Sequence, residues 1–80
     1  MVSVWVYYSM NLTAWGEYDS ALKTLAGSSG GTLDGSGTDL DLNERDLSFA
    51  FPTEASARTF AARVNGRPSR NFRTELRLSV

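Results

Sequence analysis

The nine residues Asp-Leu-Ser-Phe-Ala-Phe-Pro-Thr-Glu at positions 46–54 constrain the fold more than any other part of the chain. Large apolar residues alternate there with small or polar ones, which is typical of a half-buried β-strand. Thr53 can then cap a helix through its hydroxyl, and apolar residues follow at helical spacing until Gly66 ends the pattern. The sequence therefore predicts a strand over 46–51 that leads directly into a helix over 54–64.

Three further segments have apolar residues at a regular spacing. Residues 2–8 alternate with bulky side chains on both faces, which predicts a central strand. Apolar residues at spacings of three and four predict a helix over 13–26, with Gly27 as its left-handed stop. Residues 72–80 alternate again and predict a last strand.

The segment between the first helix and residue 46 is less regular. Residues 27–38 are rich in Gly and Ser, which predicts a flexible loop, with a short strand at 32–34 as an option. Two leucines alternate with two aspartates over 39–42, as in an edge strand whose outward carboxylates deter pairing between sheets. Residues 43–45 are then expected to form a hairpin turn.

The predicted order is β-α-β-β-α-β in a single α+β domain over residues 1–80. Right-handed crossovers place both helices on one face of a four-stranded antiparallel sheet with strand order 4-1-3-2, the ferredoxin-like split βαβ arrangement. The expected core joins the inward residues of the strands to the apolar faces of the helices: Val4, Val6, Trp15, Leu22, Leu25, Leu47, Phe49, Phe51, Phe60, Val64, Leu76 and Leu78.

The composition excludes many chemistries. The chain has no Cys and no His, so thiolate and imidazole metal sites and His-activated nucleophiles are absent. The spacing of the acidic residues does not match a calcium-binding loop. We therefore expect no enzyme, no metal site and no cofactor. No apolar run approaches the ~20 residues of a membrane span, and the first residues do not resemble a signal peptide, so a cytoplasmic location without membrane contact is expected.

The charges are segregated along the chain. Residues 1–57 carry two cations and eight anions, whereas residues 58–80 carry six Arg and one Glu. Such asymmetry often marks an interaction surface. The alternative is that the two halves neutralise each other across the fold.

The predicted topology leaves one sheet face without helices. Trp5 and Tyr7 of the first strand point to that face, beside Arg73 and Arg77 of the last strand. Trp, Tyr and Arg are the residues that concentrate binding energy in interfaces, so this face is the first candidate for partner binding. The acidic edge at 39–46 is the second, through Asp39, Asp41 and Asp46. The alternative to partner binding is that a loop of this chain, or a second copy in a dimer, simply covers the two rings.

Part of the chain resembles the RNA-recognition motif. Val4-Trp5-Val6, followed by Asn11-Leu12, resembles the first conserved strand of that family. Further along this chain, the family's third strand and second helix are resembled by four features: Phe49, Phe51, Ala57 and Val64-Asn65-Gly66. The resemblance implies base stacking by exposed aromatics on the first and third strands. With Phe51 in the buried aromatic place, the stacking places of the third strand fall on Asp46 and Ser48, and only Trp5 keeps an aromatic.

These observations favour a small, non-enzymatic protein-binding regulator or inhibitor that acts by occluding a partner's surface. Its size resembles that of phage-encoded inhibitors of bacterial defence systems, anti-CRISPR proteins among them. The first alternative is a module that binds single-stranded RNA or DNA through the same face. The second is a homodimer that binds a small molecule, or acts as an enzyme, between two open faces.

Overall fold

The structure is a computed structural model that describes residues 2–9, 15–66 and 72–78. Four strands and two helices alternate in the order β-α-β-β-α-β. Their bounds are β1 Val2–Ser9, α1 Trp15–Ser28, β2 Thr32–Asp39, β3 Glu44–Phe51, α2 Glu54–Asn65 and β4 Phe72–Leu78.

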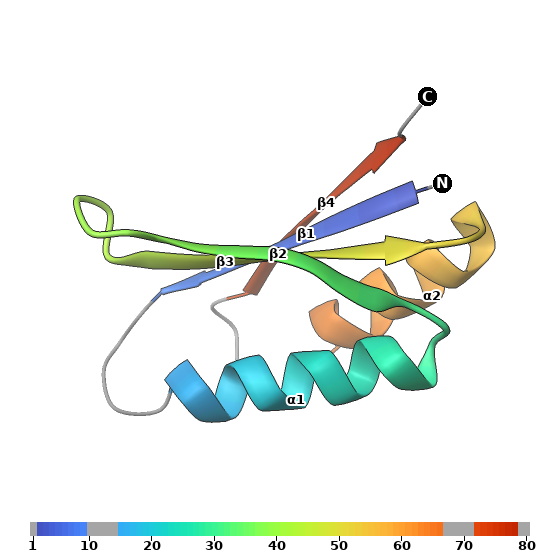
Figure 1. Cartoon of the computed structure of the whole chain (residues 1–80), viewed down its shortest axis with the longest axis horizontal. Coiled ribbons are helices and arrows are strands. Elements are labelled where there is room, and N and C mark those ends of the chain that lie inside the picture. The colour runs from blue at the N-terminus through green and yellow to red at the C-terminus, as the bar shows by residue number, and fades with distance from the viewer. Residues whose placement is uncertain (1, 10–14, 67–71, 79–80) are drawn as a thin grey trace.

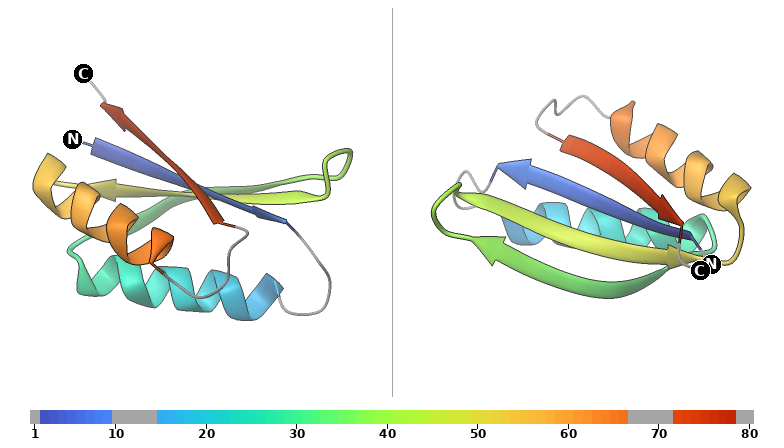
Figure 2. Two further views of the ribbon diagram at one scale, coloured as in Figure 1. Left: turned by 180° about the vertical axis from the view of Figure 1, so that it is seen from behind. Right: turned by 90° about the horizontal axis from the view of Figure 1, so that it is seen from above.

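The strands form one antiparallel sheet in the order β2-β3-β1-β4. Both helices lie on the same side of this sheet (Figure 1), and the view from above shows the four strands with α1 behind them (Figure 2, right). The predicted fold class is therefore confirmed as a ferredoxin-like α+β arrangement. Its strand order, read from the other edge, is the expected 4-1-3-2.

The second helix begins and ends close to where the sequence predicts. The N–H of Ser56 donates to the hydroxyl of Thr53 over 3.1 Å, which satisfies a backbone donor of the first helical turn. At the other end, the N–H of Gly66 donates to the carbonyl of Ala62 over 3.0 Å. Local capping thus fixes α2, which carries four buried side chains toward the sheet: Ala57, Phe60, Ala61 and Val64.

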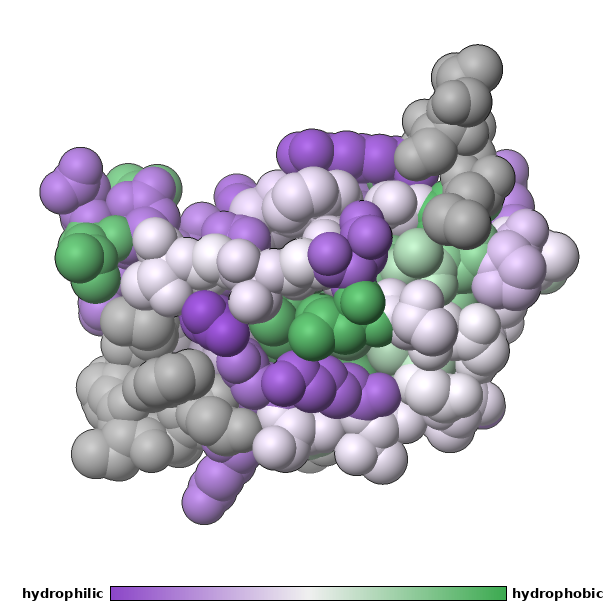
Figure 3. Space-filling view, in the orientation of Figure 1, coloured by the Kyte–Doolittle hydropathy of each residue, from purple (hydrophilic) through white to green (hydrophobic). Residues whose placement is uncertain are grey.

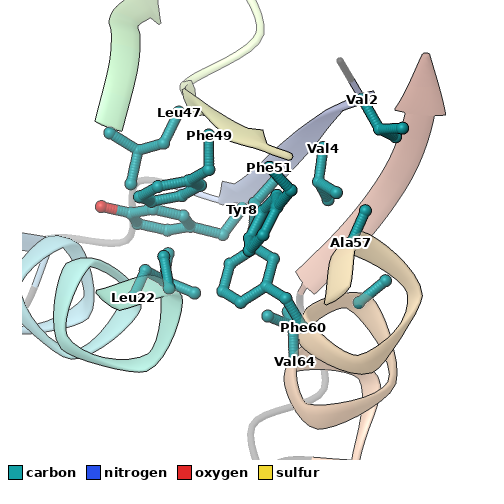
Figure 4. Packing of buried hydrophobic residues seen from close by; sticks show 13 residues of the cluster. Val2, Val4, Tyr8, Leu22, Leu47, Phe49, Phe51, Ala57, Phe60 and Val64 are labelled. Carbon is teal, nitrogen blue, oxygen red and sulfur yellow. The ribbon is translucent and has the colours of Figure 1, made fainter. Parts of the chain in front are cut away.

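The core lies between the sheet and the helices (Figure 4). Phe60 of α2 packs against two phenylalanines of β3, with ring centroids 5.1 Å from Phe49 and 5.2 Å from Phe51. Most of the predicted core residues are buried, and Leu25 and Leu76 pack at its margin. The side chains of Trp15 and Leu78 lie outside what the structure describes. The core also contains Val2, Tyr8 and Ala26, which the predicted core lacks.

The position of β2 corrects the sequence prediction. The strand runs over Thr32–Asp39, so residues 32–38 of the expected 27–38 loop belong to a strand that pairs with β3, and residues 40–42 of the expected edge strand lie in the hairpin turn. The carboxylate of Asp39 accepts N–H groups from Asp41 and Leu42 over 3.0 and 3.1 Å, and Asn43 has a φ of 52°. The turn therefore precedes residue 44, and β3 begins two residues earlier than predicted.

The end of α1 also differs from the prediction. Gly27 lies inside the helix, and the left-handed residue is Gly30, with a φ of 87°. The N–H of Gly31 donates to the carbonyl of Ala26 over 2.8 Å, and that of Gly30 to Gly27 over 3.2 Å. This pair of hydrogen bonds is the Schellman arrangement, so the later glycine supplies the stop. The predicted cap of this helix, Thr13, lies outside the described residues.

Candidate functional site at the open face of the sheet

The sheet face opposite the helices gathers side chains from three strands. Alternation along β1 sends Trp5 and Tyr7 to this face. In the antiparallel register, Tyr7 lies between Asp46 of β3 and Arg73 of β4. Trp5 lies between Ser48 and Glu75 in the next row on that face. We call this surface the open face.

The two rings of the open face carry guanidinium groups above them. The guanidinium carbon of Arg73 lies 4.4 Å from the ring centroid of Tyr7, and that of Arg77 lies 4.6 Å from the ring of Trp5. The rings themselves are 6.4 Å apart and nearly parallel. A guanidinium over an aromatic face is attracted by the ring quadrupole, at about 0.5–1 kcal/mol where water has access. The four side chains therefore support one another as a single stacked cluster.

Carboxylates balance the positive charge of this cluster. Arg77 donates to Glu75 over 2.6 Å, and Arg73 lies 3.5 Å from Glu44. The hydrogen bond from Arg77 to Glu75 raises the pKa of the guanidinium above its ordinary value. Asp46 forms no ion pair among the described residues. The open face is therefore close to electrically neutral: its guanidiniums lie on β4, and its carboxylates lie on β3 (Glu44 and Asp46) and on β4 (Glu75).

The open face is accessible in the described part of the chain. Trp5 and Tyr7 are partly exposed, and Arg73 and Arg77 keep about two thirds and one half of their side-chain surface exposed. No described helix lies over these strands (Figure 2). The structure thus brings together the four residues that the sequence places on one surface, with Asp46 beside them.

The other two predicted acidic residues lie elsewhere. Asp39 and Asp41 sit at the projecting end of the β2–β3 hairpin (Figure 1), where Asp39 holds the turn. Leu40 and Leu42 at the same end are 80% and 69% exposed, and apolar surface is visible there in Figure 3. The predicted acidic edge is therefore divided: Asp39 and Asp41 lie at one end of the molecule, and Asp46 lies on the open face.

Sequence reasoning missed a polar cluster on the helix side of the sheet. Asp19 of α1 is only 6% exposed and accepts a hydrogen bond from the hydroxyl of Tyr8. Arg45 donates to the same carboxylate over 2.7 and 3.1 Å, and its guanidinium also reaches Thr38 over 3.0 Å. The available signal was weak: Tyr8 falls on the apolar face of β1, but nothing local identifies its partners on α1 and β3.

The cluster changes the ionisation of its members. Burial, together with the hydrogen bond and the negative charge of Asp19, raises the pKa of Tyr8 above its ordinary value of 10.0. The hydrogen bond to Asp19 also raises the pKa of Arg45. Tyr8 is therefore neutral and Arg45 charged at ordinary pH. Tyr8 and Asp19 are buried, Arg45 is half-buried, and the three groups satisfy one another, so they are suited to join α1 to the sheet rather than to meet a ligand.

The described residues, 2–9, 15–66 and 72–78, contain no pocket and no cluster of three metal-ligating side chains. Neither α1 nor α2 is long and apolar enough to cross a bilayer. Comparison of the chain with protein-family models, with curated proteins and with solved structures found no match. The open face and its geometry are therefore the basis on which a function is proposed.

Proposed function

We propose that this protein is a small, non-enzymatic protein-binding module that recognises its partner through the open face. The observation that carries the proposal is the accessible cluster of Trp5, Tyr7, Arg73 and Arg77, because it combines ring and guanidinium surface in one stacked patch. Strands hold these side chains in place before binding, so little conformational freedom is lost when a partner covers them. Aromatic and Arg side chains of this kind supply most of the energy in protein interfaces.

The electrostatics favour a protein over a nucleic acid. A nucleic-acid surface needs unpaired positive charge along the phosphates and free ring faces for the bases. Here each guanidinium lies over a ring and each is close to a carboxylate. At the two third-strand positions where the RNA-recognition motif carries stacking aromatics, this chain has Asp46, which repels phosphate, and Ser48, which is 2% exposed.

The mode of action that we propose is occlusion. A partner surface covered by the open face would be withheld from its own substrates or ligands, which is how a compact inhibitor without catalytic residues acts. The size and fold class are compatible with a phage-encoded inhibitor of a bacterial defence system, anti-CRISPR-like in its action, working in the cytoplasm. This suggestion rests on analogy of size and architecture.

Affinity purification from the native host tests the proposal. Wild-type protein should recover a protein partner that Trp5→Ala and Arg77→Glu both lose. Arg58→Glu is the matched control, since Arg58 is an exposed arginine of α2 that pairs with Glu54 away from the open face. Circular dichroism should confirm that all variants are folded.

A protein partner that is retained by Trp5→Ala would contradict the use of the open face. A parallel titration with mixed single-stranded oligonucleotides at low salt tests the alternative function, which is binding of single-stranded RNA or DNA. Tight binding there that weakens steeply with added salt would favour the nucleic-acid alternative over a protein partner.

A further inference from the structure

We propose that a second copy of this chain covers the open face when no other partner is bound, in a symmetric dimer with the two sheets face to face. The inference rests on the proposed function in that it assigns a second partner to the same surface. Dimer formation and target binding would then be mutually exclusive.

The charge pattern across the strands carries the inference. On the open face, β3 contributes two carboxylates, from Glu44 and Asp46, whereas β4 contributes the guanidiniums of Arg73 and Arg77 with one intervening Glu75. The central strand between them, β1, contributes the two rings. Across these three strands the face is therefore acidic along β3, aromatic along β1 and predominantly basic along β4.

A two-fold axis parallel to the strands makes this pattern complementary to itself. Such an axis lies between the two facing sheets. It places β3 of one copy on the side of β4 of the other, and it leaves each residue at the same height along the strand direction. The β3 strand of one copy then lies over β4 of the other, and Asp46 faces Arg73 twice, since both belong to the row of Tyr7. An axis across the strands would instead set acidic β3 over acidic β3. The charges thus select one of the two symmetric arrangements.

Asp46 is well placed for such a contact. It is partly exposed and forms no ion pair among the described residues, so its carboxylate can form an ion pair with a second copy. Arg73 is 65% exposed, and its contact with Glu44 is long at 3.5 Å. A carboxylate of the second copy could therefore replace this long ion pair, and among the described residues the contact with the ring of Tyr7 is the only other interaction that the guanidinium would have to keep or give up.

The size of the face sets the expected strength. Seen from above, the molecule extends over 33 × 16 Å between Cα atoms. This outline includes α2 and the projecting hairpin, so with side chains added the open face can bury at most the ~800 Å² per partner of an ordinary interface. We therefore expect a dimer that dissociates on dilution, not a permanent one. A target with a better-fitting surface could then compete for the same face.

Charge exchange tests the dimer directly. Sedimentation equilibrium of the wild type from ~10 µM to ~1 mM should show a dimer whose fraction rises with concentration. Asp46→Lys alone and Arg73→Glu alone should each raise the dissociation constant by at least about tenfold, because each sets like charges against each other twice. Arg58→Glu, on α2, should leave it unchanged.

Mixing the two variants in equal amounts should restore a dimer, detected by native mass spectrometry as a heterodimer. There the introduced lysine faces the introduced glutamate, and native Asp46 of one copy faces native Arg73 of the other. A wild type that stays monomeric at ~1 mM, or a mixture that stays monomeric, overturns the proposal. A monomer that still binds a target through Trp5 would leave the proposed function standing. A dimer that recovers no protein partner would support the contact between two copies and contradict the proposed function.

Discussion

Tyr7 and Tyr8 are neighbours in the sequence, and they show how differently the two faces of one sheet use similar chemistry. Tyr8 points to the helices, is 2% exposed and donates to Asp19, which also binds Arg45. Tyr7 points to the open face, is partly exposed and lies under Arg73. Each ring has a guanidinium in its surroundings, but only the buried one belongs to a hydrogen-bonded network shielded from water.

The comparison shows that burial, not the type of contact, decides whether a charged pair stabilises the fold or stays available for binding. On the helix side, removal of one partner leaves the other charge desolvated, and that loss is large. On the open face, water replaces a lost partner at little cost. The first arrangement therefore specifies the fold, whereas the second leaves its charges available for another molecule. Four changes, from the largest effect to the smallest, test this contrast.

Asp19→Ala should lower the free energy of unfolding by about 3 kcal/mol, because it leaves the Arg45 guanidinium and the Tyr8 hydroxyl without their shared acceptor. Urea denaturation followed by circular dichroism measures the change. The double variant Asp19→Ala, Arg45→Met should recover part of the loss, since it removes the stranded charge. A single variant as stable as the wild type would show that the network does not hold α1 to the sheet.

Gly31→Ala should lower the unfolding free energy by about 2 kcal/mol, because the new methyl group would lie 2.4 Å from the buried ring of Phe51. Gly37→Ala is the matched control on the open face. There the new methyl would lie 3.2 Å from the carboxylate of Asp46, which can move into water. Thermal unfolding should separate the two variants clearly. Equal melting temperatures would mean that both faces tolerate added volume alike.

Raising the pH should weaken the fold through Tyr8. Its pKa is raised in the folded state, so below pH ~10 both states hold the phenol proton and the full stability is present. Above pH ~10 the unfolded chain loses that proton first, and the unfolding free energy falls by up to about 1.4 kcal/mol per pH unit. Urea titrations between pH 9 and 11 should show a shallower fall for Tyr8→Phe than for wild type. Parallel slopes would contradict a perturbed Tyr8.

Arg73→Ala should lower the unfolding free energy by no more than about 1 kcal/mol, because its ion pair with Glu44 is long and its contact with the ring of Tyr7 is accessible to water. The same variant should weaken self-association and partner binding. Urea denaturation and sedimentation of one preparation measure both effects. A loss of stability comparable to that of Asp19→Ala would remove the distinction between the two faces.

Much of the fold can be read from the sequence where local pattern and final burial agree. Phe49 and Phe51 alternate with small residues and are buried, and Thr53 and Gly66 delimit α2 as expected. The strict alternation of β1 predicts that Trp5 lies on the open face, as it does. In these segments each residue's neighbours along the chain already indicate which side faces the core.

The prediction fails where local pattern and pairing disagree. Leu40 and Leu42 alternate with aspartates as a strand would, yet they form the exposed end of a hairpin. The true strand, β2, contains two glycines and few apolar residues, so its own sequence favours a loop. Its hydrogen bonds to β3 impose the extended conformation, and the Asp39 turn sets the register.

By itself, the amino-acid sequence determined the order of the elements, the inward and outward faces of β1, β3 and β4, and the composition of the open face. These follow from periods of two and of about 3.6 residues, which act over short distances along the chain. Only the tertiary structure decided the position of β2 and the meeting of Tyr8, Asp19 and Arg45. Both depend on contacts between residues far apart in the chain, whose free energy exists only once the sheet has assembled.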